Sequence, residues 1–167
     1  MPKVLYDKQG HVVTITINRP EVMNALDLET GDLLVEAWSR FRDDDDAYVA
    51  ILTGAGDRSF SAGADLKMIS QVDLRSWSMD QIRTRTYNAK GDVGYTRGID
   101  VFKPTIAAIN GYCFAAGLET ATWCDIRIAA EHAEFGCLER RWNVGLSDGG
   151  TVRLPLIIGL GRALELI

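Results

Sequence analysis

The sequence predicts an α/β fold in which at least some of the strands are parallel. Three short apolar runs, residues 48–53, 104–109 and 125–130, suit buried strands. Helical or small-residue stretches alternate with these runs, which favours a sheet built with helical crossovers. No internal repeat and no low-complexity linker interrupts the 167 residues, so we treat residues 1–167 as one unit.

The first third of the chain is predicted to form a hairpin and a helix. Residues 4–7 and 12–17 alternate or run apolar around Lys8-Gln9-Gly10, as in a β-hairpin. Asp27 is placed to cap a helix. One side of that helix carries the apolar residues Leu33, Leu34, Ala37, Trp38 and Phe41. The acidic run 43–46 indicates a solvated break and is weak evidence for calcium.

The rest of the chain is less regular. Residues 73–100 are polar and favour helix, interrupted by glycines, and residues 115–123 predict a short small-residue helix. Residues 133–137 predict a fourth strand. After the glycine-rich turn at 145–150, Thr151 is expected to cap a helix, and residues 159–167 begin another. Because that last helix has no stop signal, we expect the covalent protein to continue beyond Ile167.

Composition excludes several classes of function. The net charge of −5 and pI near 5.0 give no reason to expect nucleic acid as a partner. No apolar run reaches membrane-spanning length, and no apolar segment follows Lys3 as in a signal peptide. The three cysteines lack a framework or zinc-knuckle spacing, so we expect reduced thiols in a cytoplasmic protein and no metal site. His132 is expected at the surface.

Two glycine motifs admit other chemistries. Gly54-Ala55-Gly56 follows a predicted strand and resembles a dinucleotide-binding loop, but the third glycine is missing, which favours a plain turn. The run 145–149 fits the G-x-S-x-G pattern of a serine nucleophile at Ser147. No buried strand is predicted directly before it and no histidine follows it, which favours a chance match.

Two further loops, residues 61–66 and 110–119, lead from predicted strands into helices through small residues. Backbone N–H groups at a helix start lack partners and favour negative charge. Two such groups that converge on one point would form an oxyanion hole, a cradle for a negatively charged oxygen. Tight packing of helix against strand is the alternative explanation for the small residues.

Two glutamates add to this interpretation. Glu119 lies on an otherwise apolar or small-residue helix, where a carboxylate is costly unless it is exposed or used. Glu139 follows the predicted strand 133–137. Two carboxylates in an apolar pocket can divide into an acid and a base. The residues alone leave open that both are surface glutamates.

A set of motifs in consistent order resembles the enoyl-CoA hydratase/isomerase (crotonase) family. The matching stretches are Asn18-Arg19-Pro20, Asn24-Ala25-Leu26, Leu52-Thr53-Gly54, residues 60–67, residues 103–111, Cys124-Asp125, Phe135-Gly136 and Gly149-Gly150-Thr151. They cover nearly the whole chain. The resemblance implies a spiral of ββα turns, with residues 1–167 as the catalytic core and C-terminal helices beyond the chain.

The resemblance also implies the site. It assigns the N–H groups of Ala64 and Ala116 to the oxyanion hole, Glu119 to the base that activates water, and Glu139 to the acid that protonates Cα. The residues that it places at coenzyme A are Ala62, Gly63, Ala64, Asp65 and Leu66. It implies an acyl-CoA thioester as substrate, no metal or other cofactor, and a homotrimer or hexamer where the C-terminal part is present.

The resemblance favours enoyl-CoA hydration, because both glutamates are present. An isomerase, a specialised acyl-CoA dehydratase and a non-catalytic protein of the same fold are the alternatives. The chain departs from the family pattern at Ala115-Ala116, where glycines are frequent, and at Asn143, Leu146 and Ser147, beside the second glutamate. These departures concern the oxyanion hole and the shape of the acyl pocket.

Overall fold

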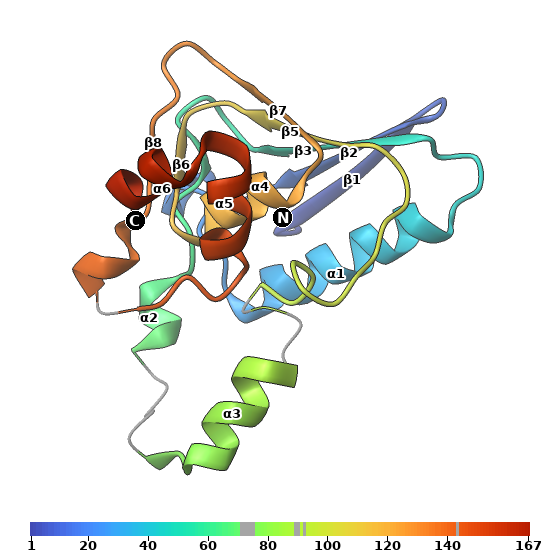
Figure 1. Ribbon diagram of the computed structural model, residues 1–167. Coiled ribbons are helices and arrows are strands. Elements are labelled where there is room, and N and C mark those ends of the chain that lie inside the picture. Colours follow the sequence, from blue (N-terminus) through green and yellow to red (C-terminus); the bar gives the residue numbers. More distant parts are fainter. Residues whose placement is uncertain (71–75, 89–90, 92, 143) are drawn as a thin grey trace.

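The computed structural model describes residues 1–70, 76–88, 91, 93–142 and 144–167 (Figure 1). The strands are β1 (Val4–Gln9), β2 (Val12–Ile17), β3 (Val49–Gly54), β4 (Ser59–Ser61), β5 (Thr105–Ile109), β6 (Tyr112–Phe114), β7 (Ile126–Ala129) and β8 (Phe135–Gly136). The α-helices are α1 (Leu28–Asp43), α2 (Leu66–Ile69), α3 (Met79–Asn88), α4 (Ala116–Trp123), α5 (Gly150–Ile158) and α6 (Leu160–Leu166). Short 3-10 helices include η1 (Pro20–Val22) and η3 (Leu138–Trp142).

The strands form two sheets. The larger sheet has the order β1-β2-β3-β5-β7, and the smaller has the order β4-β6-β8. Only the β1–β2 hairpin is antiparallel; the other strand pairs within the named strands are parallel. Three successive turns of chain each place one strand in the larger sheet and the next in the smaller: β3 with β4, β5 with β6, and β7 with β8. The predicted α/β spiral is confirmed.

The hairpin is confirmed, but its first strand is longer than predicted. Lys8 and Gln9 pair with Val13 and Val12 as part of β1. The turn therefore falls on Gly10 and His11, and Gly10 adopts a φ of 58°, which glycine reaches without a steric cost.

Two strands were not predicted. Residues 59–61 and 112–114 form β4 and β6, although the sequence indicated loops. The hydroxyls of Ser59 and Ser61 make burial possible, because each finds a partner: Ser59 Oγ donates to Met23 O at 2.9 Å and Ser61 Oγ donates to Asn24 O at 2.8 Å. Buried polar groups are tolerated when they are hydrogen-bonded in this way.

Helix α1 lies against strands β1 and β2 of the larger sheet (Figure 1). Its predicted apolar side is confirmed, since Leu34, Ala37 and Trp38 are buried. The Asp27 carboxylate accepts the Thr30 N–H at 2.8 Å, which confirms the helix cap. Trp38 and Phe41 are fully buried from α1, together with Ile15 and Leu52 from the sheet. Trp38 also contacts Tyr95 and Trp123, so that the core continues toward α4.

The prediction for residues 73–100 holds in part. Helix α3 occupies 79–88 and extends away from the sheets in Figure 1. Residues 93–100 form turns rather than helix. Residues 71–75, 89–90 and 92 lie outside the described part of the chain.

The predicted cap at Thr151 is wrong. Helix α5 begins one residue earlier, at Gly150, and its N-cap residue is Gly149, with a φ of 98°. Thr151 is exposed within the first turn. A residue in the left-handed region must precede this helix, and glycine meets that requirement better than threonine.

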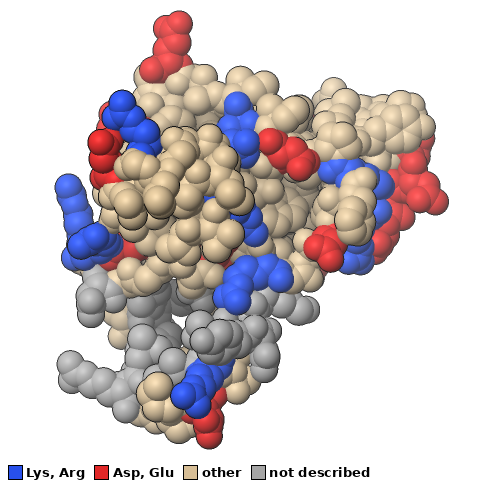
Figure 2. Space-filling model, in the orientation of Figure 1, with Lys and Arg blue, Asp and Glu red and all other residues tan. Residues whose placement is uncertain are grey.

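Acidic and basic side chains are interspersed on the face that Figure 2 shows. The acidic run 43–46 is held by ion pairs, since Lys8 Nζ lies 2.7 Å from an oxygen of Asp44 and 3.3 Å from one of Asp46. Among the described residues, no helix combines the length and the apolar composition needed to cross a membrane.

Candidate active site

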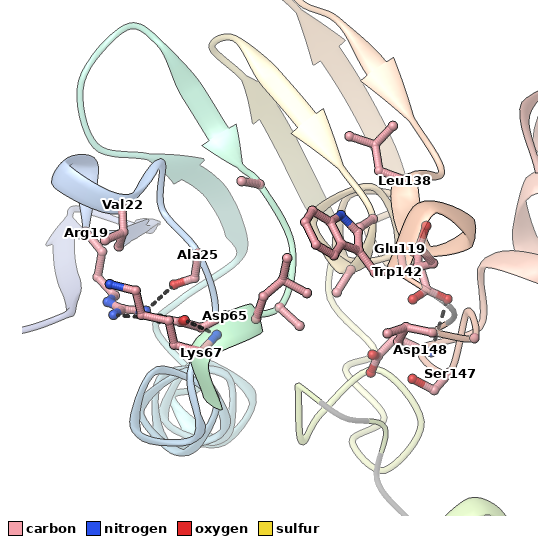
Figure 3. A pocket seen from close by; sticks show the side chains of 18 residues that line it. Arg19, Val22, Ala25, Asp65, Lys67, Glu119, Leu138, Trp142, Ser147 and Asp148 are labelled. Atoms are coloured by element: carbon pink, nitrogen blue, oxygen red, sulfur yellow. Dashed lines mark hydrogen bonds and ion pairs between the residues drawn. The ribbon is translucent and has the colours of Figure 1, made fainter. Parts of the chain in front are cut away.

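A pocket of about 490 Å³ lies between the β4–α2 loop, the start of α4, and the segment from η3 to α5 (Figure 3). Its lining is predominantly apolar or small, with a few polar side chains, as is usual for small-molecule sites. The residues that line it are Arg19, Val22, Ala25, Ala62, Ala64, Asp65, Leu66, Lys67, Ala115, Ala116, Glu119, Leu138, Glu139, Trp142, Val144, Gly145, Ser147 and Asp148.

The two small-residue loops meet at this pocket. A Cβ atom on Gly63 would lie 2.7 Å from the Ala115 Cβ and 3.1 Å from the Ala116 nitrogen. A Cβ on Gly117 would lie 2.8 Å from the Ser61 Cβ. Glycine is therefore needed at both positions for the loops to approach one another, and the two candidate oxyanion-hole segments lie side by side.

The N–H group of Ala64 faces away from the neighbouring chain. Leu26 forms a parallel bridge to Ala64, in which Leu26 N donates to Gly63 O and Asp65 N donates to Leu26 O, each at 2.8 Å. In such a bridge, the residue between the two bonded positions turns its own N–H to the opposite side. Because Ala64 also lines the pocket, its N–H is a candidate donor to a ligand there.

The N–H group of Ala116 is the first of helix α4, so the helix itself offers it no acceptor. The preceding residue, Ala115, has φ 52° and ψ −130°, a conformation that glycine adopts far more readily. The Ala115 N–H donates to Gly136 O at 2.9 Å, which anchors this strained residue to β8. Ala115 therefore holds a backbone conformation that favours glycine.

Glu119 is buried, with 2% of its surface exposed, and extends from α4 into the pocket. Its Oε1 accepts the N–H groups of Asp148 at 3.1 Å and Gly150 at 2.7 Å. Burial raises the pKa of Glu119 to about 8; the Gly150 N–H opposes this rise, and the charges of Asp148 and Glu139 add to it. Its proton is therefore bound and released near neutral pH.

Glu139 lies in η3 and lines the same pocket, with 6% of its surface exposed. Both carboxylate oxygens are buried and neither has a hydrogen-bond partner among the described residues. Burial raises the pKa of Glu139, and the charge of Asp148 adds to that rise. The structure thus brings the two predicted glutamates to one pocket and excludes the alternative that both are surface residues.

The predicted coenzyme A loop forms one rim of the pocket. Ala62, Ala64, Asp65 and Leu66 line it, whereas Gly63 faces Ala115 instead. Arg19 stabilises this rim through two contacts. Its Nη2 lies 3.2 Å from an Asp65 oxygen, and its Nη1 donates to Ala25 O at 2.6 Å (Figure 3).

Sequence reasoning missed several residues of the pocket. Leu138, Trp142 and Val144 supply apolar surface in the pocket, and Asp148 lies next to Glu119 (Figure 3). The position of Leu138 and Trp142, immediately around Glu139 in the chain, is the signal that could have found them. The partners of Asp148 are remote in sequence, so no local pattern indicated its role.

The other motifs are placed as the sequence favoured. The residues before Ser147 include the 3-10 helix η3 rather than a strand, so the nucleophile-elbow context is absent from the described residues around it. Gly54 ends β3 and packs against the Asn24 side chain, as part of a turn. Cys113, Cys124 and Cys137 are free and buried, and His132 is exposed. Asn143 lies outside the described residues.

Comparisons with known proteins assign the chain to one family. Residues 7–167 match the model of the enoyl-CoA hydratase/isomerase family, and the chain belongs to that family. It is 37% identical over 164 residues to a short-chain-enoyl-CoA hydratase of Clostridium acetobutylicum. It is 40% identical over 167 residues to an (E)-benzylidenesuccinyl-CoA hydratase of Thauera aromatica.

Solved structures give the same result. An enoyl-CoA hydratase from Mycobacterium marinum superposes with a TM-score of 0.84 at 33% identity, over 99% of this chain and 61% of that one. One from Bacillus anthracis gives 0.83 at 36% identity, over 99% and 62%. The two curated relatives are covered over 60% and 62% of their length by 98% and 100% of this chain. The chain therefore spans about three fifths of the proteins that it matches.

Proposed function

We propose that the protein is an enoyl-CoA hydratase, which adds water reversibly across the 2,3 double bond of a trans-2-enoyl-CoA. The observation that supports this most strongly is the pairing of Glu119 and Glu139, both buried, in a pocket that Ala64 and Ala116 also line. Relatives bearing hydratase names support the same class of reaction.

In the proposed reaction, ionised Glu119 takes a proton from water while the water oxygen bonds to Cβ. The electron pair of the double bond moves toward the thioester, whose oxygen becomes enolate-like and is held by the N–H groups of Ala64 and Ala116. Protonated Glu139 delivers its proton to Cα. One water is added in total, and the proton on Glu119 returns to Glu139 through solvent. No electron transfer occurs, so the reaction requires no redox cofactor.

The environments of the two carboxylates suit these roles. Glu119 accepts two N–H groups, which favour its ionised form, whereas the oxygens of Glu139 have no donor among the described residues. Because burial places the pKa of Glu119 at about 8, kcat/KM for hydration should rise with pH toward that value, and it should fall again where Glu139 loses the proton that it delivers.

The direct test follows the loss of the conjugated-thioester absorbance when the purified protein is mixed with a short trans-2-enoyl-CoA. We expect loss with the wild type and little with Glu139→Gln. Ser147→Ala is the matched control, since Ser147 also lines the pocket and has no role in the proposed chemistry. A folded protein that converts no enoyl-CoA, or one whose activity depends on Ser147 and not on Glu139, would refute the proposal.

Assembly and location are part of the same proposal. Helices α5 and α6 expose large apolar side chains, including Leu156, Leu160 and Leu164, which suits coverage by further protein in a trimer or hexamer. The three buried free thiols suit the reducing cytoplasm. Light scattering on the protein with the C-terminal part present would test the assembly; a monomer under that condition would contradict it.

A further inference from the structure

Asp148 is a third carboxylate in the pocket, and the proposed reaction gives it no part. It is 1% exposed, lies next to Glu119 and belongs to the turn before α5 (Figure 3). A buried carboxylate is costly unless its surroundings compensate for the lost hydration. The contacts around Asp148 supply such compensation.

The side chain of Asp148 binds residues 93–96, a segment that is remote in sequence. Its Oδ1 accepts the Thr96 hydroxyl at 2.5 Å and the Val93 N–H at 3.2 Å. Two donors on one oxygen favour the ionised carboxylate. Gly91, with a φ of 87°, leaves the space for this cluster, because a Cβ there would overlap the Thr96 hydroxyl and the Asp148 carboxylate.

Arg153 of α5 joins the same two residues through their backbones. Its Nη1 donates to Asp148 O at 2.6 Å, and its Nη2 donates to Thr96 O. Asp148 and Thr96 are therefore connected twice, through a side-chain pair and through a shared guanidinium. The bonds that reach Thr96 span 52 positions from Asp148 and 57 from Arg153, so these contacts join segments that are remote in sequence.

The backbone of Asp148 acts on Glu119. Its N–H and that of Gly150 both donate to Glu119 Oε1. A Cβ on Gly150 would lie 2.9 Å from that oxygen, so the turn fits closely around the glutamate. The position of this turn therefore determines the position of Glu119.

We propose that Asp148 is a positioning residue of the active site: its buried carboxylate ties residues 93–96 to the turn whose amides hold Glu119, and supplies a fixed negative charge beside the two glutamates. The inference rests on the proposed role of Glu119. The electrostatic part can be tested without turnover.

Other titratable groups near Glu119 also affect its pKa, so the effect of the Asp148 charge must be separated from theirs. Burial is the largest cause of the raised pKa of Glu119, and the charges of Asp148 and of Glu139 in η3 raise it further. The Cys137 thiol, which precedes η3, and the Arg153 guanidinium on α5 interact electrostatically with Glu119. Asp148 additionally faces Tyr95, so a variant must remove its charge while leaving these neighbours in place.

The test titrates Glu119 by infrared difference spectroscopy, with the Glu119 band assigned by its loss in Glu119→Gln. Asp148→Asn removes the charge and keeps the shape and the N–H donor. We expect the midpoint of Glu119 to fall by about one pH unit, which is a tenfold weaker proton affinity. Thr96→Val, the matched control, removes one hydrogen bond and leaves every charge, so it should not lower the midpoint in this way.

An unchanged midpoint in Asp148→Asn, or an equal fall in Thr96→Val, would overturn the inference whether or not the protein is active. Asp148→Ser, which also removes the charge, takes the place of the asparagine variant should that one not fold. In an active protein, the acid limb of the kcat/KM profile should move with the midpoint in Asp148→Asn. If Asp148→Asn changes the melting temperature but leaves the acid limb of the kcat/KM profile in place, Asp148 has only a structural role.

Discussion

Replacement of Glu119 by glutamine should make the protein more stable at alkaline pH. The side chain of glutamine has nearly the same shape, and its oxygen can still accept the N–H groups of Asp148 and Gly150. What the replacement removes is ionisation. The folded protein resists ionisation of Glu119, because burial raises its pKa to about 8 from an ordinary value of 4.5.

The raised pKa of Glu119 determines whether stability rises or falls with pH. A carboxyl whose folded pKa is raised binds its proton more tightly in the folded state, so its contribution to stability is greatest below the unfolded pKa and is lost as pH rises toward the folded pKa. The pKa of Glu119 is 4.5 in the unfolded state and about 8 in the folded state. The unfolding free energy of the wild type should therefore fall by about 4 kcal/mol between pH 5 and pH 9 through this group, and that of Glu119→Gln should not. The buried amide of the glutamine costs about 1–3 kcal/mol at every pH.

The assay is urea unfolding of both proteins at pH 5, 7 and 9. The difference between their unfolding free energies should change steadily in favour of Glu119→Gln with rising pH, and other titrating groups cancel in that difference. A difference that stays constant within about 1 kcal/mol over this range would refute the description of Glu119 as a buried carboxylate with a raised pKa.

Two further predictions concern backbone geometry. Gly150→Ala should lower kcat/KM at least tenfold, because its Cβ would lie 2.9 Å from Glu119 Oε1; Gly161→Ala, where nothing lies within 4 Å, is the control and should leave activity unchanged. Ala115→Gly should raise the unfolding free energy by about 1 kcal/mol, since relief of the strain at φ 52° outweighs the greater chain entropy of glycine. Thermal unfolding checks it; a lower melting temperature would contradict the claim of strain.

The parts of the fold that follow local periodicity could be predicted from the sequence. The hairpin and α1 have clear alternation, helical spacing and a cap, and all of these are present. Strands β4 and β6 could not be predicted, since Ser59 and Ser61 are polar and become buried only through hydrogen bonds to residues 36 and 37 positions away. Residue type favours Thr151 as a cap, but the backbone requires glycine two positions earlier, at Gly149.

The candidate site also contains residues that the sequence predicts and residues that it does not. Glu119 and Glu139 were proposed from residue type and family resemblance, and the structure places both at one pocket. The role of Asp148 depends on Thr96, 52 positions away, and on Arg153, which no periodicity connects to it. Tertiary contacts of this kind are absent from any sequence pattern.

The central claim is that Glu119 and Glu139 act as a pair on an enoyl-CoA. The most direct measurement compares kcat for hydration in the wild type, Glu119→Gln, Glu139→Gln and the double variant, each shown to be folded. We expect each single replacement to lower kcat by about 10²–10⁴, and the double variant to be far less impaired than the product of the two losses. Single variants that retain wild-type kcat would contradict the claim.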